Sequence, residues 1–193
     1  MARVMVFVDG SYFESQMRLL GTNLRWDIDR LGPSLVGATG LPNATFEWLH
    51  YYGSYAPPGA CRTPGDRRAR EQKMLFLERL SHSRGVSVTA FERSLRAERC
   101  SSCSTEVVVP REKGVDVTLA SDMLRLAWAD AYGAAVLVSG DADLLPAVKA
   151  LRNQGIKVLV ASLTDRAGLA RDLRRECWAV IPLQELAPGF VRD

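Results

Sequence analysis

The segment AVLVSGDAD (residues 135–143) ends a short apolar run in two aspartates, and VMVFVD (residues 4–9) ends a similar run in one. Apolar runs of this length are typical of buried strands. Strand-like and helix-like segments alternate along the rest of the chain, which predicts an α/β fold with a mainly parallel sheet. In such a sheet, ligands bind outside the carboxyl ends of the strands. We therefore expect these acids to mark a site.

Four aspartates are candidates for this site. Asp9 and Asp141 follow the two strand-like runs, Asp143 comes two residues later, and Asp116 opens a helical segment. Carboxylates that converge repel one another, and a hard divalent cation such as Mg²⁺ or Mn²⁺ relieves the repulsion because it takes oxygen ligands. The pattern predicts metal-assisted chemistry on phosphate, in which a cation activates water and stabilises the leaving oxygen.

Each aspartate also has a purely structural explanation. Asp143 could cap a helix with Pro146 at its third position, and Asp141 could close an Asx-turn. Asp9 and Asp116 could each favour the dipole of the helix that follows. These explanations do not account for acids at both strand ends and at a helix start between them, so the combination favours a functional site.

The expected elements are short and regular. Strands are expected at 3–8, 46–55, 86–91, 135–139, 156–160 and 178–181, and helices at 11–20, 27–37, 66–81, 115–131, 144–153 and 166–175. Asp66 is expected to cap the helix at 66–81, after a loop rich in proline and glycine. The pattern predicts one domain over residues 1–186, with a hairpin-containing excursion at about 92–113, and a C-terminal tail over 187–193.

The composition is that of a soluble globular protein, with 193 residues, 47% hydrophobic, 24% charged and a net charge of +3. No apolar run approaches the roughly 18 residues that a membrane-spanning helix needs. The N-terminus leads directly into a strand-like run without the layout of a signal peptide, so we expect a cytoplasmic protein. Two histidines are too few for a histidine-rich metal site.

Three other folds with acidic pockets are disfavoured by the residues around Asp9. An adhesion-type metal site needs Asp-x-Ser-x-Ser, but the last position here is Phe13. A haloacid-dehalogenase-type phosphatase needs a second aspartate where this chain has Ser11. A response-regulator receiver domain needs paired acids after the first strand, and these are absent from the sequence.

Three motifs in order carry a family resemblance. The chain reads VDGS at residues 8–11, EKGVDV at 112–117 followed by ASDML at 120–124, and VSGDADL at 138–144. Together they resemble the NYN family of PIN-like domains, most closely its LabA-like bacterial branch, over about residues 3–182. The resemblance implies a three-layer α/β/α PIN-like fold and a Mg²⁺- or Mn²⁺-dependent ribonuclease site.

The resemblance also implies roles for single residues. The metal-binding, catalytic acids would be Asp9, Asp116, Asp141 and Asp143, with Ser139 and Ser11 supporting them. Tyr12 departs from the family pattern, which usually has asparagine at this position. The phenol could donate a hydrogen bond, stack on a base, or mark weakened catalysis.

Basic residues gather in two segments. The first cluster is Arg62, Arg67, Arg68, Arg70 and Lys73, and the second lies in the excursion and includes Arg96, Arg111 and Lys113. A solvated surface explains such runs as well as a ligand does. With Tyr12, Tyr52 and Tyr55 as stacking partners, the clusters could follow single-stranded RNA; the alternative places these tyrosines in the core or its rim.

The cysteines are expected to be reduced, as is usual in a cytoplasmic chain. Cys100 and Cys103 have the spacing of a zinc knuckle, but structural Zn²⁺ takes four ligands. Cys61, His82 or a second subunit would have to complete the site. A structural Zn²⁺ and a homodimer therefore stay as alternatives to free thiols in a monomer.

Two functions from different classes follow. The first is a metal-dependent ribonuclease that hydrolyses RNA phosphodiester bonds at the four aspartates. The second is a non-catalytic RNA-binding regulatory domain that keeps the acidic pocket. A phosphate-ligand sensor is a third alternative, which RNA binding with a steep salt dependence would exclude.

Overall fold

A computed structural model describes residues 1–21, 25–99, 101–163 and 168–192 of the chain. The strands are β1 (Ala2–Asp9), β2 (Arg25–Trp26), β3 (Ala44–Tyr55), β4 (Val86–Glu92), β5 (Ser94–Arg99), β6 (Glu106–Arg111), β7 (Ala134–Val138), β8 (Lys157–Ser162), β9 (Ala179–Pro182) and β10 (Val191–Arg192). The helices are α1 (Gly10–Leu19), α2 (Ile28–Gly37), α3 (Pro64–Ser81), α4 (Val115–Trp128), α5 (Leu145–Asn153), α6 (Arg171–Glu176) and α7 (Leu183–Phe190), with 3₁₀ turns η1 (Pro58–Ala60) and η2 (Ala142–Leu144).

The central sheet has six strands in the order β4-β3-β1-β7-β8-β9. Every neighbouring pair in it is parallel, which confirms the predicted α/β architecture. Strands β3 and β4, which follow β1 in the chain, lie on one side of it in the sheet, and β7 lies on the other side. The boundary between β1 and β7 is therefore the topological switch point, where open parallel sheets form their ligand-binding crevice.

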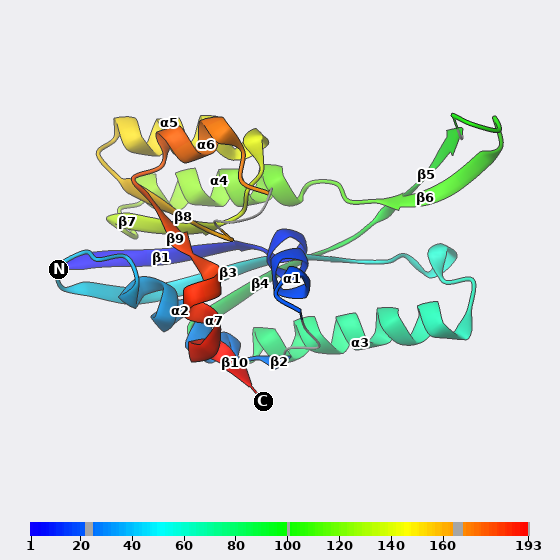
Figure 1. Cartoon of the computed structure of the whole chain (residues 1–193), viewed down its shortest axis with the longest axis horizontal. Coiled ribbons are helices and arrows are strands. Elements are labelled where there is room, and N and C mark those ends of the chain that lie inside the picture. Colours follow the sequence, from blue (N-terminus) through cyan, green and yellow to red (C-terminus); the bar gives the residue numbers. More distant parts are fainter. Residues whose placement is uncertain (22–24, 100, 164–167, 193) are drawn as a thin grey trace.

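Helices cover both faces of the sheet and complete a three-layer α/β/α fold of the PIN-like type (Figure 1). Helices α1, α2, α3 and α7 pack against one face in a single apolar cluster. Helices α4, α5 and α6 pack against the other face in a second cluster. Residues 4–8 of β1 are buried on both faces, as the continuous apolar run of a central parallel strand predicts.

The excursion after β4 is an antiparallel hairpin formed by β5 and β6, as predicted. Figure 1 shows the hairpin extending beyond the end of the central sheet, on the same side as the N-terminal end of α3. A two-stranded ribbon buries little apolar area by itself. Leu95 and Val108 are accordingly exposed on it.

Two predicted helix caps are wrong. Thr63, not Asp66, caps α3, and Asp66 is the third helical residue of a capping box in which each residue bonds the other's backbone N–H. Asp143 does not cap α5, which begins at Leu145 with Pro146 at its second position. The nearest N-cap is Asp141, which caps the η2 turn: its Oδ1 accepts the Asp143 N–H at 2.9 Å.

The C-terminal segment also differs from its prediction as a tail over 187–193. Helix α7 continues to Phe190, and Ala187 and Phe190 are buried in the core beside Phe13. Strand β10 then pairs with β2. The apolar positions of α7 pack against α2 in the first apolar cluster.

Other boundaries moved by a few residues. Helix α4 ends at Trp128 instead of 131. Helix α6 covers Arg171–Glu176 instead of the predicted 166–175, of which 166 and 167 lie outside the described residues. Within the part of the chain that the structure describes, no helix is both long and apolar enough to cross a membrane.

Candidate functional site

Asp9 and Ser139 connect the two strands at the switch point. Val8 of β1 pairs with Val138 of β7, so the next residues, Asp9 and Ser139, are neighbours. Ser139 Oγ donates to Asp9 Oδ2 at 3.2 Å and also accepts the Asp141 N–H at 3.3 Å. Since Ser139 is fully buried, this hydroxyl holds both acidic segments in register without contacting solvent.

Asp9 is a buried carboxylate, with only 7% of its surface exposed. Its Oδ1 accepts the Tyr12 N–H at 3.0 Å, so the residue is also the N-cap of α1. The pKa of Asp9 is raised from 3.8 to about 6, chiefly by burial and also by the negative charges of Glu112 and Asp116, while the hydrogen bonds from Tyr12 and Ser139 lower it in part. Asp9 is therefore a helix cap whose buried carboxylate also lies at the carboxyl edge of the sheet.

Asp116 lies in the first turn of α4 and faces the same edge of the sheet. Gly114 begins this turn with φ 90°, a left-handed conformation that suits glycine. The pKa of Asp116 is raised, first by burial and then by the charges of Asp141, Glu112 and Asp143. The structure thus places Asp116 within electrostatic reach of the other three predicted aspartates.

Glu112 is a fifth acid that the sequence analysis did not assign. Its Oε2 accepts a hydrogen bond from Ser11 Oγ at 2.8 Å and another from Ser54 Oγ. Arg93 donates to Ser54 Oγ at 2.9 Å, and its guanidinium lies 4.0 Å from Glu112. Glu112 was visible in the EKGVDV motif, directly after the predicted hairpin, but nothing in the sequence indicated these partners.

The donor set suits a hard cation, because the candidate ligands are carboxylate oxygens. The geometry does not form a complete cation site, because among the residues that the structure describes no three His, Cys, Asp or Glu side chains are grouped closely enough to hold an ion. Asp141 and Asp143 are exposed, whereas Asp9 is buried. Asp141 Oδ1 is also engaged as the cap of η2, where it accepts the Asp143 N–H.

Tyr12 packs under the loop that carries Asp141 and does not point its phenol at an acid. Its Oη donates to Ser162 Oγ at 2.8 Å. A Cβ atom on Gly140 would lie 1.5 Å from the Gly168 carbonyl oxygen and 2.7 Å from the Tyr12 ring. The Ala170 N–H donates to the Gly140 carbonyl at 3.0 Å, so this close approach fixes the loop.

Asp122 lies outside the acidic pocket. It accepts a hydrogen bond from Tyr52 Oη at 3.0 Å and pairs with Arg125. Tyr52 is only 1% exposed, so of the three tyrosines predicted as stacking partners it belongs to the core. Tyr12 and Tyr55 are half-buried.

The basic residues predicted to bind RNA differ in their environments. Exposed members are Arg62, Arg67 and Arg68 near the start of α3, and Arg96, Arg111 and Lys113 on or after the hairpin. Arg111 forms a two-pronged pair with Glu98 at 2.7 and 2.8 Å. Arg70 and Lys73 are half-buried, with Arg70 near Glu92 and Lys73 paired with Glu14.

The predicted zinc alternative involves Cys100, which lies outside the described residues. Cys103 is exposed at the hairpin turn, and its Sγ lies 3.2 Å from Thr105 Oγ1. Cys61 is a free, half-buried thiol near the start of α3. Cys177 is half-buried against the second apolar cluster, and burial raises the pKa of its thiol.

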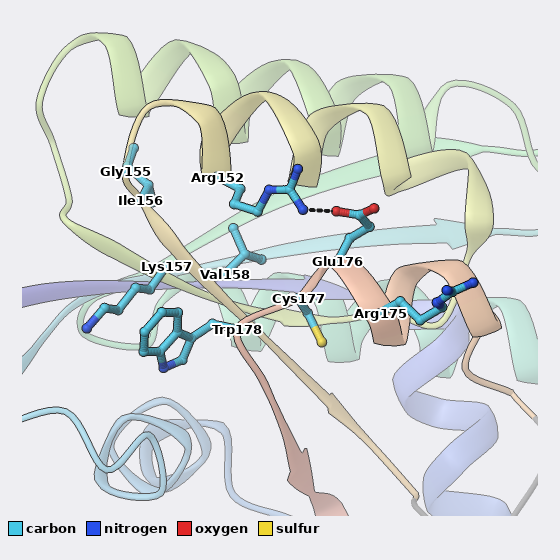
Figure 2. A pocket seen from close by; sticks show the side chains of 9 residues that line it. All are labelled: Arg152, Gly155, Ile156, Lys157, Val158, Arg175, Glu176, Cys177 and Trp178. Carbon is cyan, nitrogen blue, oxygen red and sulfur yellow. Dashed lines mark hydrogen bonds and ion pairs between the residues drawn. The ribbon is translucent and has the colours of Figure 1, made fainter.

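A separate pocket lies between the start of β8 and the link from α6 to β9 (Figure 2). It has a volume of about 320 Å³ and contains Arg152, paired with Glu176, and the exposed Trp178 beneath Lys157. Lys157 is the first residue of β8, whereas the acids follow the carboxyl ends of their strands. This pocket contains none of the predicted site residues.

The comparisons with known proteins give one family. The family model described as NYN domain matches residues 3–184 of the chain. No curated protein matches the chain. Among solved structures, phosphofructokinase-2 from Escherichia coli in complex with potassium is similar, with a TM-score of 0.37 and 11% identity, over 86% of this chain and 55% of that one. The chain spans about half the length of that protein, and a likeness this weak carries no argument about either.

Proposed function

The chain belongs to the NYN domain family, whose members are generally ribonucleases, and on that premise we propose that Asp9, Asp116, Asp141 and Asp143 form a metal-dependent site that hydrolyses RNA. The observation that carries the proposal is the mutual effect of these acids. The pKa of Asp116 is raised by the charges of Asp141 and Asp143, and that of Asp9 by Asp116. Carboxylates that raise one another's pKa are frequent at functional sites. A divalent cation bound between them would replace their mutual repulsion by attraction to its positive charge.

Asp9 has the most constrained position in the proposed site. Two donors, the Tyr12 N–H and Ser139 Oγ, hold its carboxylate at the end of β1. A pKa of about 6 leaves it mainly ionised at neutral pH, yet makes it a stronger base than an ordinary aspartate. With a cation bound, Asp9 would act as a fixed ligand, because the positive charge lowers the pKa of the carboxylate that holds it.

The other residues have supporting roles in this proposal. Mg²⁺ or Mn²⁺, held by the four aspartates, would supply a water of lowered pKa and stabilise the leaving oxygen. Ser139 fixes Asp9 and Asp141 relative to each other. Ser11 holds Glu112, whose negative charge adds to the field that attracts the cation.

The proposed substrate is single-stranded RNA. The N-terminal end of α3 and the hairpin extend beyond the edge of the sheet where the acids lie (Figure 1), and both segments carry exposed arginines. These cations would contact backbone phosphates that flank the cleaved bond. We further propose that the chain belongs to the LabA-like bacterial branch of the family, on the motifs at residues 8–11, 112–117 and 138–144.

A non-catalytic RNA-binding domain is the second candidate, and two observations favour it. The Tyr12 phenol, at the position where the family usually has asparagine, bonds Ser162 and none of the acids. The described acids are also not grouped tightly enough to hold an ion without side-chain rotation. Incubation of a labelled single-stranded RNA with Mn²⁺, Mg²⁺ or EDTA separates the two: cation-dependent products support the ribonuclease, and binding without products supports the regulatory domain.

A further inference from the structure

A basic groove lies beside the acidic pocket. It has a volume of about 440 Å³, and its walls come from α1, the end of β3, the η1 turn, α3 and the base of the hairpin. Pockets of about 300–1,000 Å³ are typical for small ligands. The groove is thus large enough for one nucleotide, and none of the four aspartates lines it.

The charges in the groove favour an anion. Arg18, Arg70, Lys73 and Arg93 line it, together with only two acids, Glu14 and Asp66. Lys73 is paired with Glu14, and Asp66 is bound into the α3 capping box. Arg18 is exposed and has no ion pair with any residue that the structure describes. Its guanidinium is the cation most available to a phosphate.

The groove also carries a stacking surface. The Arg70 guanidinium lies 5.6 Å from the centroid of the Tyr55 ring, and its Nε donates to the Ala56 carbonyl at 2.9 Å. Both planar groups line the groove and are half-buried. Bases stack on aromatic rings and on guanidinium planes. Because the Tyr55 ring and the Arg70 guanidinium are already held in place, they offer a base a preformed stacking surface.

A short hydrogen-bonded chain connects the groove to the acids. Ser54 and Arg93 line the groove and also contact Glu112. Glu112 accepts the Ser11 hydroxyl two residues after Asp9, and its charge raises the pKa of Asp9. A strand that leaves the acidic pocket toward α3 therefore enters the groove next.

We propose that this groove is a subsite for one unpaired nucleotide of the RNA substrate, with its base against Arg70 and Tyr55 and its phosphate on Arg18. This inference rests on the proposed function for the position of the cleaved bond. It adds Arg18 to the residues expected to contact RNA, and it places Tyr55, one of the predicted stacking partners, against the base. It also requires single-stranded substrate, because a base inside a duplex is already stacked and paired.

The test is RNA binding in EDTA, where cleavage cannot interfere. Fluorescence anisotropy with a labelled single-stranded oligonucleotide compares wild type with Arg18→Ala, Tyr55→Leu and Tyr55→Trp, and with Arg30→Ala as the matched control on the surface of α2. We expect Tyr55→Leu to weaken binding by about 5- to 150-fold and Tyr55→Trp to restore it, since one stacked base contributes that much. Arg18→Ala should reduce the slope of log K against log salt by about 0.7, the value for one phosphate contact in a single strand.

Two results would overturn the subsite. One is equal binding by Arg18→Ala, Tyr55→Leu and the Arg30→Ala control; the other is equal binding of wild type to the oligonucleotide and to its duplex. Far-UV circular dichroism checks that each variant is folded, and Arg18→Ala keeps the test valid if Tyr55→Leu unfolds the chain. Wild-type cleavage with unaffected binding by the variants would refute the subsite and leave the ribonuclease intact. Groove-dependent binding without cleavage would refute the ribonuclease and keep the subsite.

Discussion

Ser139 Oγ and Asp9 Oδ2 are 3.2 Å apart, and this hydrogen bond joins residues separated by 130 positions in the sequence. It places the acid that ends β1 beside the loop that follows β7. Both residues are buried, so the bond is protected from water. The acidic pocket is consequently anchored on rigid core strands at Asp9 and exposed to ligands at Asp141 and Asp143.

The buried charge of Asp9 predicts a dependence of stability on pH. The native state keeps the Asp9 proton up to a pKa of about 6, whereas the unfolded state releases it near 3.8. The native state therefore binds more protons in this window, and the free energy of unfolding falls as pH rises through it. In metal-free buffer, we expect Asp9→Asn to stabilise the protein at neutral pH by up to roughly 3 kcal/mol.

Urea denaturation in EDTA measures this effect. The stabilisation by Asp9→Asn should be present at about pH 7.5 and nearly lost at about pH 4, where the wild-type carboxyl is protonated in the native state. Asp29→Asn, an exposed acid on α2, is the control and should show no such difference. A variant that is equally destabilised at both pH values would contradict the raised pKa.

The close contact at Gly140 predicts strong intolerance of a side chain. Gly140→Ala would place a methyl group 1.5 Å from the Gly168 carbonyl oxygen, and a backbone atom cannot simply rotate away. We expect a loss of more than about 2 kcal/mol in the free energy of unfolding. Gly37→Ala is the matched control, because nothing lies within 4 Å of its added Cβ atom and alanine favours the helix by about 0.5–1 kcal/mol. Equal stability of the two variants would contradict the described loop.

The sequence was sufficient to predict the sheet and the position of Asp9 beside the 139–143 loop at one edge of it. Apolar runs such as 4–8 and 135–138 have one plausible structure, and parallel strands bring their carboxyl ends to one edge. These features depend on patterns that repeat over several residues.

The features that the sequence did not predict depend on single tertiary contacts. Thr63 and Asp66 both suit a helix cap, and only the backbone conformation decides that Thr63 precedes the first turn. Glu112 is held by hydrogen bonds from the hydroxyls of Ser11 and Ser54, which are 101 and 58 residues away in the sequence. The phenol of Tyr12 reaches Ser162 across 150 residues. No local pattern encodes such pairings.

Metal binding predicts a thermal shift. A cation that binds only the native state stabilises it by about 2.7 kcal/mol at a hundredfold excess over its Kd, or roughly 5–10 °C in Tm for a chain of this size. We expect Mn²⁺ or Mg²⁺ to produce this shift in wild type and in Asp29→Asn. Asp141→Asn should lose most of the shift, because it removes one charged ligand. Scanning fluorimetry with and without EDTA measures it, and equal shifts in wild type and Asp141→Asn would place the cation elsewhere.

Cleavage of single-stranded RNA by the purified protein tests the central claim most directly. The account predicts products with Mn²⁺ or Mg²⁺, none with EDTA, full activity for Asp29→Asn, and at least about a 100-fold lower rate for Asp9→Asn and Asp141→Asn. Both inactive variants should bind RNA at least as tightly as wild type, because each removes a negative charge near the phosphate. RNA that is bound but left intact under both cations, by wild type and by Tyr12→Asn alike, would contradict the ribonuclease and leave the regulatory binding domain as the function.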